Sequence, residues 1–321
     1  MSSSALVRRR IGRAALDERL IAPGPSGRLV AVHRLLALAI LVRLIERPWW
    51  RMAQRPAELF EPVWAVSWLS SPPPLGILVA VQAIGALAAL TAVAGWYGRW
   101  TFPVAWGSLV FVAACWGSSG KVMHNEVLLV TVAFPMLWTA LPARGAPASV
   151  DQRWGWAPRA CTAALGAVYF ATGFQKLRHS GIDWVFSDNM AWVVRQGSSP
   201  FGRDLNVWFG NVGWLMVSLA AGALLFELSA PVLLAFRRTR IVVPIVSFTM
   251  HTSIWVFLGL NYSSWVLTAV AVAVPMAMQW DADSLDRPWY RRIVWPWQRP
   301  EGDPGRTRRP GGSARTVGAM P

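Results

Sequence analysis

The sequence alternates long apolar segments with short polar turns. Apolar stretches of about 18 residues or more are long enough to cross a bilayer, and only a helix satisfies its own backbone hydrogen bonds there. We therefore expect an all-α fold, a polytopic membrane bundle of about eight helices. The predicted helices lie near residues 29–45, 76–97, 101–119, 124–142, 157–176, 212–236, 241–260 and 262–280.

Two of the segments between these helices are long, and the second of them carries its own helical pattern. Residues 177–211 contain "SDNMAWVVRQG", in which Ser187 is placed to cap a short helix and Gly197 to end it. Met190, Val193 and Val194 have the spacing of one helical face. The pattern predicts a short interfacial helix that lies flat on the outer membrane surface or covers the bundle.

The charge distribution sets the expected orientation and the domain limits. Most arginines fall on one side if both termini are cytoplasmic, which agrees with the positive-inside rule for a cell-membrane protein. We expect a basic cytoplasmic segment at 1–27, with no removable signal peptide, and a transmembrane domain at 28–280. Residues 281–321 are expected to form a basic cytoplasmic tail rich in Arg, Gly and Pro. From about residue 298 onward this tail is predicted to be disordered, and its positive charge favours anionic lipid headgroups.

Composition excludes several other classes of protein. The net charge of +15 comes with no nucleic-acid-binding motif and no single basic stripe, so we expect no nucleic-acid partner. Cys115 and Cys161 both fall in apolar segments without a CxxC pattern. The histidines lack HxxxH or HExxH spacing, and no metal site is predicted. Most of the 21 tryptophans are expected to anchor helices at the membrane interface.

The lysines are the unusual cations, because all other basic residues are arginines and only Lys121 and Lys176 are lysines. An arginine stays protonated, whereas a desolvated lysine can give up its proton. Lys176 shares a helical face with Tyr169 and Gly173 at the predicted outer end of a membrane helix. Two interpretations remain open: Lys176 is a base facing an outer cavity, or it is a helix-end lysine that reaches the headgroups.

Three further ionisable residues lie in apolar surroundings. "GKVMHNE" puts Lys121 and His124 one turn apart at a predicted outer helix start, where His124 is either a proton carrier or a residue solvated by headgroups. Glu227 lies inside one predicted span and His251 inside the next. They could pair with each other or with Arg34, form a buried clamp, or line a pocket.

Four motifs in one order resemble a known family: "HNEVLLVTVAFPMLW", "FATGFQKLRHSGIDW", "LLFELSAPVLLAF" and "FTMHTSIWVFLGLNYSSW". Together they resemble the HTTM membrane domain of vitamin K-dependent gamma-carboxylases and many bacterial relatives, over roughly residues 28–280. In that family a lysine on the outer side deprotonates a reduced quinone, which starts the carboxylation of a peptide glutamate.

The resemblance implies roles for particular residues here. Lys176 matches the motif lysine, followed by Asp183 and Trp184, and His124 resembles the histidine that opens the corresponding earlier helix. Glu227 is similar to the glutamate of the family's F-E-L-x-x-P motif, and His251 to the histidine that follows it. The implied catalytic residues are Lys176 and His124, and the implied cofactor is menaquinol or vitamin K hydroquinone.

Three functions are compatible with the sequence. One is a quinol-dependent carboxylase of the lyase class, facing outside. The second is a non-catalytic membrane module that holds a quinone, a lipid or a partner helix. The third is a maturation factor for an exported peptide within a small membrane complex. The family's large extracytoplasmic domain has no counterpart after residue 280, so we expect a secreted peptide to dock on the outer loops or on a small membrane partner.

Overall fold

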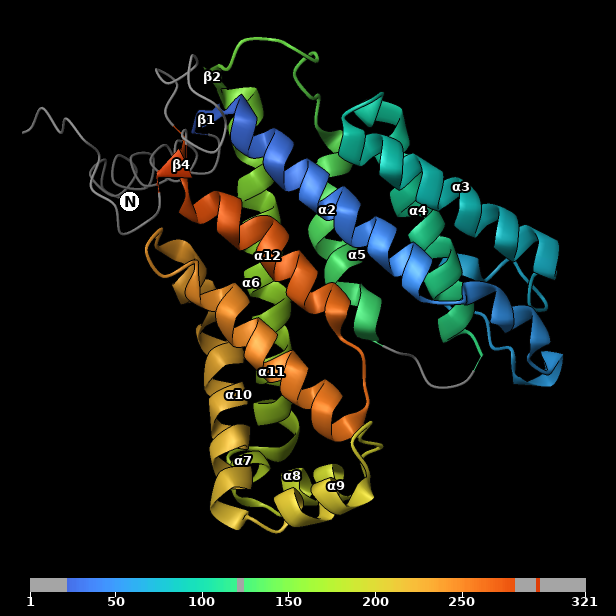
Figure 1. Ribbon diagram of the computed structural model, residues 1–321, viewed down its shortest axis with the longest axis vertical. Coiled ribbons are helices and arrows are strands. Elements are labelled where there is room, and N and C mark those ends of the chain that lie inside the picture. The colour runs from blue at the N-terminus through green and yellow to red at the C-terminus, as the bar shows by residue number, and fades with distance from the viewer. Residues whose placement is uncertain (1–21, 120–123, 281–292, 295–321) are drawn as a thin grey trace, which may run out of the picture.

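The computed structural model describes residues 22–119, 124–280 and 293–294, and this part of the chain is almost entirely helical (Figure 1). The α-helices are α2 (Ser26–Glu46), α3 (Leu75–Ala94), α4 (Gly98–Gly117), α5 (Val127–Ala133), α6 (Gln152–Ser180), α7 (Asp183–Phe186), α8 (Asn189–Arg195), α9 (Arg203–Gly210), α10 (Gly213–Ala235), α11 (Val242–Leu258) and α12 (Ser263–Ala277). Short 3-10 segments are η1 (Trp49–Gln54), η2 (Ala57–Leu59), η3 (Trp64–Val66), η4 (His124–Glu126) and η5 (Phe134–Trp138).

Three of the described helices are long and apolar enough to cross a membrane: α3, α4 and α10. The segment Val127–Trp138 and helices α11 and α12 are apolar but shorter. Helices α2 and α6 are long, with 21 and 29 residues, but carry several charges. The structure thus agrees with a helical membrane protein, and helices occupy all eight segments that the apolar pattern indicated.

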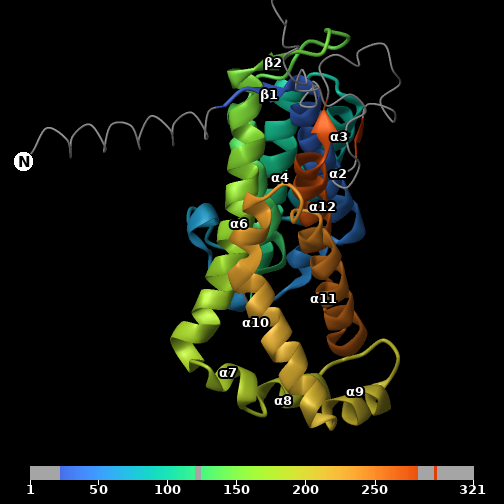
Figure 2. The same cartoon turned by 90° about the vertical axis from the view of Figure 1, so that its left-hand side faces the viewer.

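One continuous apolar core joins the bundle. Helix α2 packs against α3 on one side and α12 on the other, and α6 packs along α10. Figure 2 shows α6 and α10 side by side. The core contains side chains from α2, α4, α5, α6 and α12 that are fully buried, such as Leu36, Phe102 and Tyr169. Small residues line many of these contacts, which lets helix backbones approach closely.

The two ends of the bundle differ. At one end α2 and α6 begin and α12 ends: the guanidinium group of Arg28 donates to the carbonyl of Met278 at 3.4 Å. Strands β1 (Gly24–Pro25) and β2 (Val150–Asp151) pair there, with Gly24 opposite Asp151. Strands β3 (Gln279–Trp280) and β4 (Ile293–Val294) form a second short pair. The short helices α7, α8 and α9 lie at the opposite end (Figure 2).

Local sequence explains where two of the expected helices differ from the structure. The predicted helix at 124–142 is broken, because Pro135 follows α5 and the chain tightens into η5 before leaving the helix at Thr139. The helix expected at 157–176 is longer at both ends. Asp151 caps its start by accepting a hydrogen bond from the Arg153 amide at 2.9 Å.

A short helix, α8, is present within the segment 177–211 where an interfacial helix was expected, with three corrections. Its N-cap is Asp188, without a side-chain cap bond, so the predicted cap at Ser187 is wrong. Gln196 ends the helix, and Gly197 follows it. Its buried face consists of Ala191 and Val194 rather than Val193, because these two pack on Met216 of α10. Helices α7 and α9, on either side, were not expected.

The predicted terminal segments fall almost entirely outside the described residues. This applies to residues 1–21 of the expected cytoplasmic segment and to the tail from residue 295 onward. The expectations of a basic N-terminal segment and a disordered tail therefore stay predictions.

Candidate functional site

An ion pair between α6 and α10 forms the centre of the candidate site. The ammonium group of Lys176 donates to both carboxylate oxygens of Glu227, at 2.6 Å each. The Glu227 side chain is 8% exposed and that of Lys176 27%. Glu227 thus pairs with Lys176, a partner that the sequence did not indicate, and of the alternatives left open the structure favours a buried clamp between helices over a pair with His251 or Arg34. A charge held inside an apolar helix is stabilised only by such a partner.

Gly173 explains how the two helices come close enough for this pair. A Cβ atom at Gly173 would lie 2.9 Å from the Cβ of Glu227 and 3.2 Å from the Leu228 side chain. Any side chain at 173 would therefore push α10 away from α6. The glycine, one turn before Lys176, lets the carboxylate of Glu227 reach the lysine.

A hydrogen-bonded chain of buried polar groups lies beside the pair. The Tyr169 hydroxyl group is 2.8 Å from the Ser247 hydroxyl, and both residues are fully buried. Nδ1 of His251 lies 2.8 Å from the Ser247 carbonyl oxygen. Because a carbonyl oxygen only accepts, Nδ1 carries the proton, and the lone pair of the neutral ring is on Nε2. No described residue hydrogen-bonds to Nε2.

Aromatic rings surround these polar groups. The Lys176 ammonium lies 4.6 Å from the centre of the Trp184 ring, a cation–π contact supplied by α7. Tyr169 packs edge-on against Phe226 and Trp265, with ring centres 5.0 and 5.4 Å apart. His251 lies 5.4 Å from the same Trp265 ring. Aromatic rings therefore pack directly against the lysine, the tyrosine and the histidine of the site.

The site contains most, but not all, of the residues that the sequence singled out. Lys176, Tyr169, Gly173, Trp184, Glu227 and His251 come together from α6, α7, α10 and α11. Lys176 also interacts electrostatically with His251. Lys121 lies outside the described residues, and the backbone of His124 begins η4. The role expected for these two residues stays a prediction.

Two participants were not predicted. Ser247 links Tyr169 to His251, and its signal was present in the i, i+4 spacing of Ser247 and His251 on one helical face. Trp265 separates the two rings, but one tryptophan among many in an apolar helix gives no distinguishing signal.

A second buried ion pair lies elsewhere, between α2 and η4. The guanidinium group of Arg43 pairs with Glu126 and Glu46, and Arg47 adds a contact to Glu126 at 3.1 Å. The Arg43 and Glu126 side chains are 3% and 7% exposed. Both cations of this cluster are arginines, which stay protonated, and both pair with Glu126. We therefore interpret the cluster as a structural clamp that holds the end of α2 to η4.

The Lys176 site offers groups that can take or hold a proton, beside aromatic rings. These groups are the Lys176–Glu227 pair and Nε2 of His251. Within the residues that the structure describes, no group of three or more His, Cys, Asp and Glu side chains converges.

Comparisons with known proteins return no relative: no family model, no curated protein and no solved structure matches the chain. The functional argument therefore rests on the side chains and their geometry.

Proposed function

We propose that the chain is a multi-pass membrane protein that binds a reduced quinone beside Lys176 and Glu227 and accepts a proton from it. The resemblance to the carboxylases suggests the reaction, the carboxylation of a peptide glutamate. The observation that carries the proposal is the Lys176–Glu227 pair itself. Ionisable groups inside membrane helices are costly and mark functional pathways more often than structural ones.

The pair supplies a proton acceptor whose position is fixed. If Lys176 passes a proton to Glu227, both groups become neutral, and the amine has a free lone pair within an apolar site. Trp184 covers one side of that amine, so the open side is where a substrate hydroxyl would approach. His251 holds a second acceptor, Nε2, with its ring oriented through Ser247.

A reduced quinone, when bound, would supply the acidic hydroxyl and the electrons that dioxygen takes up. In the overall reaction a γ-carbon of a peptide glutamate loses a proton and forms a bond to carbon dioxide. Lys176 would begin it by taking the hydroxyl proton, which returns the amine to an ammonium, while Glu227 keeps the proton that it received from Lys176. Tyr169 and Trp265 would exclude water from the apolar face of the ligand.

The proposed topology has eight membrane helices, both termini in the cytoplasm and the Lys176 site toward the outside. Its support is that α2 begins and α12 ends at the same end of the bundle, while the end of α6 that carries Lys176 leads into α7 and α8. The arginine excess of the first end then agrees with the positive-inside rule.

A second candidate is a non-catalytic module that holds a quinone or lipid. The observation that favours it is that Lys176 and Glu227 also join two long helices at a close contact through Gly173. In that case the ion pair is a clamp, like the cluster around Arg43, and the lysine stays charged.

The test is to purify the full chain from its native membrane and identify bound quinones by mass spectrometry. The proposal expects a stoichiometric quinone in the wild type and less in Trp184→Ala. The matched control is Arg178→Ala, an exposed residue near the end of α6 that should leave the bound quinone unchanged. Incorporation of isotopically labelled carbon dioxide into a glutamate peptide, with a reduced quinone present, then separates the enzyme from the binding module.

The outcomes separate the candidates. Quinone without carboxylation would favour the binding module. Absence of any bound or exchangeable quinone in a folded wild-type preparation would overturn the carboxylase and the quinone-binding module, and would leave a lipid-binding module or the maturation factor.

A further inference from the structure

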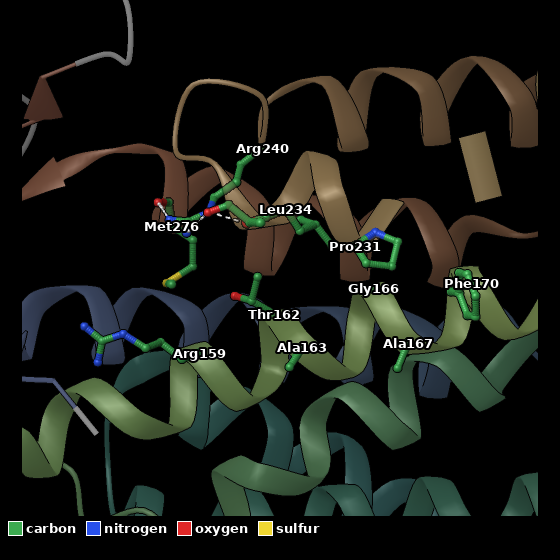
Figure 3. Close-up of a pocket in the computed structure, with 11 residues that line it drawn as sticks. Arg159, Thr162, Ala163, Gly166, Ala167, Phe170, Pro231, Leu234, Arg240 and Met276 are labelled. Atoms are coloured by element: carbon green, nitrogen blue, oxygen red, sulfur yellow. Dashed lines mark hydrogen bonds between the residues drawn. The ribbon is translucent and has the colours of Figure 1, made fainter. Parts of the chain in front are cut away.

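A groove on the bundle runs along α6, away from the Lys176 site. It has a volume of about 500 Å³ and is lined by three elements besides α6: α10, the turn after it, and α12. Figure 3 shows Thr162, Gly166 and Phe170 of α6 along one wall and Pro231 and Leu234 of α10 along the other. These walls are almost wholly apolar, so the groove suits a hydrocarbon chain.

One end of the groove is cationic. Arg159 of α6 and Arg240 of the turn after α10 both lie at this end, opposite Phe170 (Figure 3). Arg28 and Arg237 lie close by, because the charge of Arg240 acts on Arg28 and the charge of Arg237 acts on Arg240. Four guanidinium groups from three different parts of the chain therefore meet at one place.

The described residues give this cluster no negative partner. Arg28 and Arg237 donate to the carbonyls of Met278 and Ala277, and Arg240 donates to those of Leu234, Ala235 and Met276. Arg159 donates to the carbonyls of Ala22 and Pro23. Every one of these acceptors is a neutral backbone group.

Two donors are also unused. Nε of Arg28 and Nη2 of Arg237 are buried and have no hydrogen-bond partner among the described residues. Burial lowers the pKa of Arg240, and the positive charges of Arg159 and Arg237 lower it further. Like charges held together in this way are stabilised by an anion that lies between them.

The length of the groove matches one leaflet of a membrane. From Arg159 to Phe170 the helix rises about 16 Å. Half of the hydrocarbon core of a bilayer is about 15 Å thick. An acyl chain with its headgroup at the arginines would thus reach the bilayer midplane at Phe170.

We propose that this groove binds an anionic phospholipid, with the phosphate at Arg159 and Arg240 and one acyl chain along Ala163, Ala167 and Leu234. The charge of the cluster selects the anionic headgroup, and the apolar walls select a lipid over a free phosphate. The inference depends only on the chain being in a membrane, and it does not depend on the chemistry proposed for Lys176. In the proposed orientation the lipid belongs to the cytoplasmic leaflet, where anionic lipids concentrate.

Native mass spectrometry of the full chain, released from nanodiscs of phosphatidylglycerol and phosphatidylcholine, tests the proposal. The wild type should retain phosphatidylglycerol over phosphatidylcholine. Arg159→Gln and Arg240→Gln should each weaken that retention about tenfold, as expected for the loss of one charge-assisted hydrogen bond. Arg153→Gln is the matched control, since this exposed arginine of the same helix already pairs with Asp151 and should change nothing.

A second variant tests the apolar half without touching the charges. Ala167→Trp should fill the groove and displace the lipid while the arginines remain. Because this variant keeps all the arginines, it still tests the proposal if an arginine variant fails to fold.

Four results would overturn the proposal. The first is equal retention of both lipids by the wild type, and the second is unchanged retention in Ala167→Trp or in both glutamine variants. The third is displacement of phosphatidylglycerol by millimolar inorganic phosphate, which would mean a soluble-anion site. The fourth is a several-fold rise in lipid retention when Asp281, Asp283 and Asp286 are replaced with asparagine. That result would mean that these aspartates, and not a resident lipid, neutralise the arginines in the wild type.

Discussion

Replacing Lys176, then Glu227, and then both residues measures what their ion pair contributes to the free energy of unfolding. The variants are Lys176→Met, Glu227→Gln and the double variant, all close in size to the wild type. The two carboxylate oxygens both accept from the lysine at 2.6 Å, so Lys176→Met removes both hydrogen bonds, whereas Glu227→Gln removes the charge and one of the two acceptors.

The expected magnitudes follow from burial. Lys176→Met leaves Glu227, which is 8% exposed, without its cation, and should cost about 3 kcal/mol of unfolding free energy. Glu227→Gln should cost less, about 2 kcal/mol, because Lys176 remains 27% exposed and keeps the Trp184 ring. The double variant should cost about 3 kcal/mol, which is less than the sum of the two single costs, because it leaves no charge unpaired. The difference from that sum, about 2 kcal/mol, is the coupling energy of the pair.

Unfolding by SDS in mixed micelles, followed through tryptophan fluorescence, gives these free energies. The 21 tryptophans supply the signal, and Trp184 itself contacts the pair. A control cycle combines Glu227→Gln with Arg178→Met, where Arg178 is exposed and two positions from Lys176. Its effects should add, because residues at i and i+2 do not share a helix face.

Strict additivity in the Lys176–Glu227 cycle would refute the reasoning. It would mean that the two side chains do not meet in the folded protein, and the proposed proton acceptor would lose its partner.

Four further predictions extend the test. Gly173→Ala should cost about 1–3 kcal/mol by forcing α6 from α10, measured in the same SDS unfolding, whereas Gly222→Ala, with open space around it, should be neutral or stabilising. Lys176→Arg should fold normally yet lose carboxylation, because arginine cannot act as the base; full activity would leave only the clamp. Glu126→Gln should cost about 3 kcal/mol in the same unfolding, and a change below ~0.5 kcal/mol would argue against the clamp. Reporter fusions after Lys176 and after residue 300 should report opposite sides of the membrane, and signals from one side would reject the topology.

The apolar pattern predicts the helices well because each is decided by local sequence. Length and hydropathy locate α3, α4 and α10, and those same properties are what a bilayer selects. The break after α5 was missed although Pro135 is visible in the sequence, because prolines are tolerated in the other helices α4, α6 and α10. Whether a proline bends or ends a helix depends on neighbours that the local pattern does not contain.

The candidate site was predicted less completely, because it depends on which helices touch. The sequence indicated Lys176, Tyr169 and Gly173 as one face of one helix, and they do share a face. Spacing suggested His251 or Arg34 as partners of Glu227 and did not indicate Lys176, because residues on different helices leave no common pattern in the sequence. The close approach at Gly173 decides the pairing. Trp265 entered the site through tertiary packing alone, whereas the i, i+4 spacing of Ser247 and His251 in the sequence already placed Ser247 beside the histidine.

The scarcity of lysine has a consequence for the reactivity of the protein. Amine-directed reagents find only the two lysine side chains and the chain terminus, whereas the many arginines are inert to them. Acylation requires the free lone pair of an amine, and the ammonium of Lys176 is held by both oxygens of Glu227 under the Trp184 ring. The rate at which Lys176 is acylated therefore reports how often this bridge opens. The acylation of the peptide that contains Lys176, followed over time by mass spectrometry, thus reports how often α6 and α10 move apart.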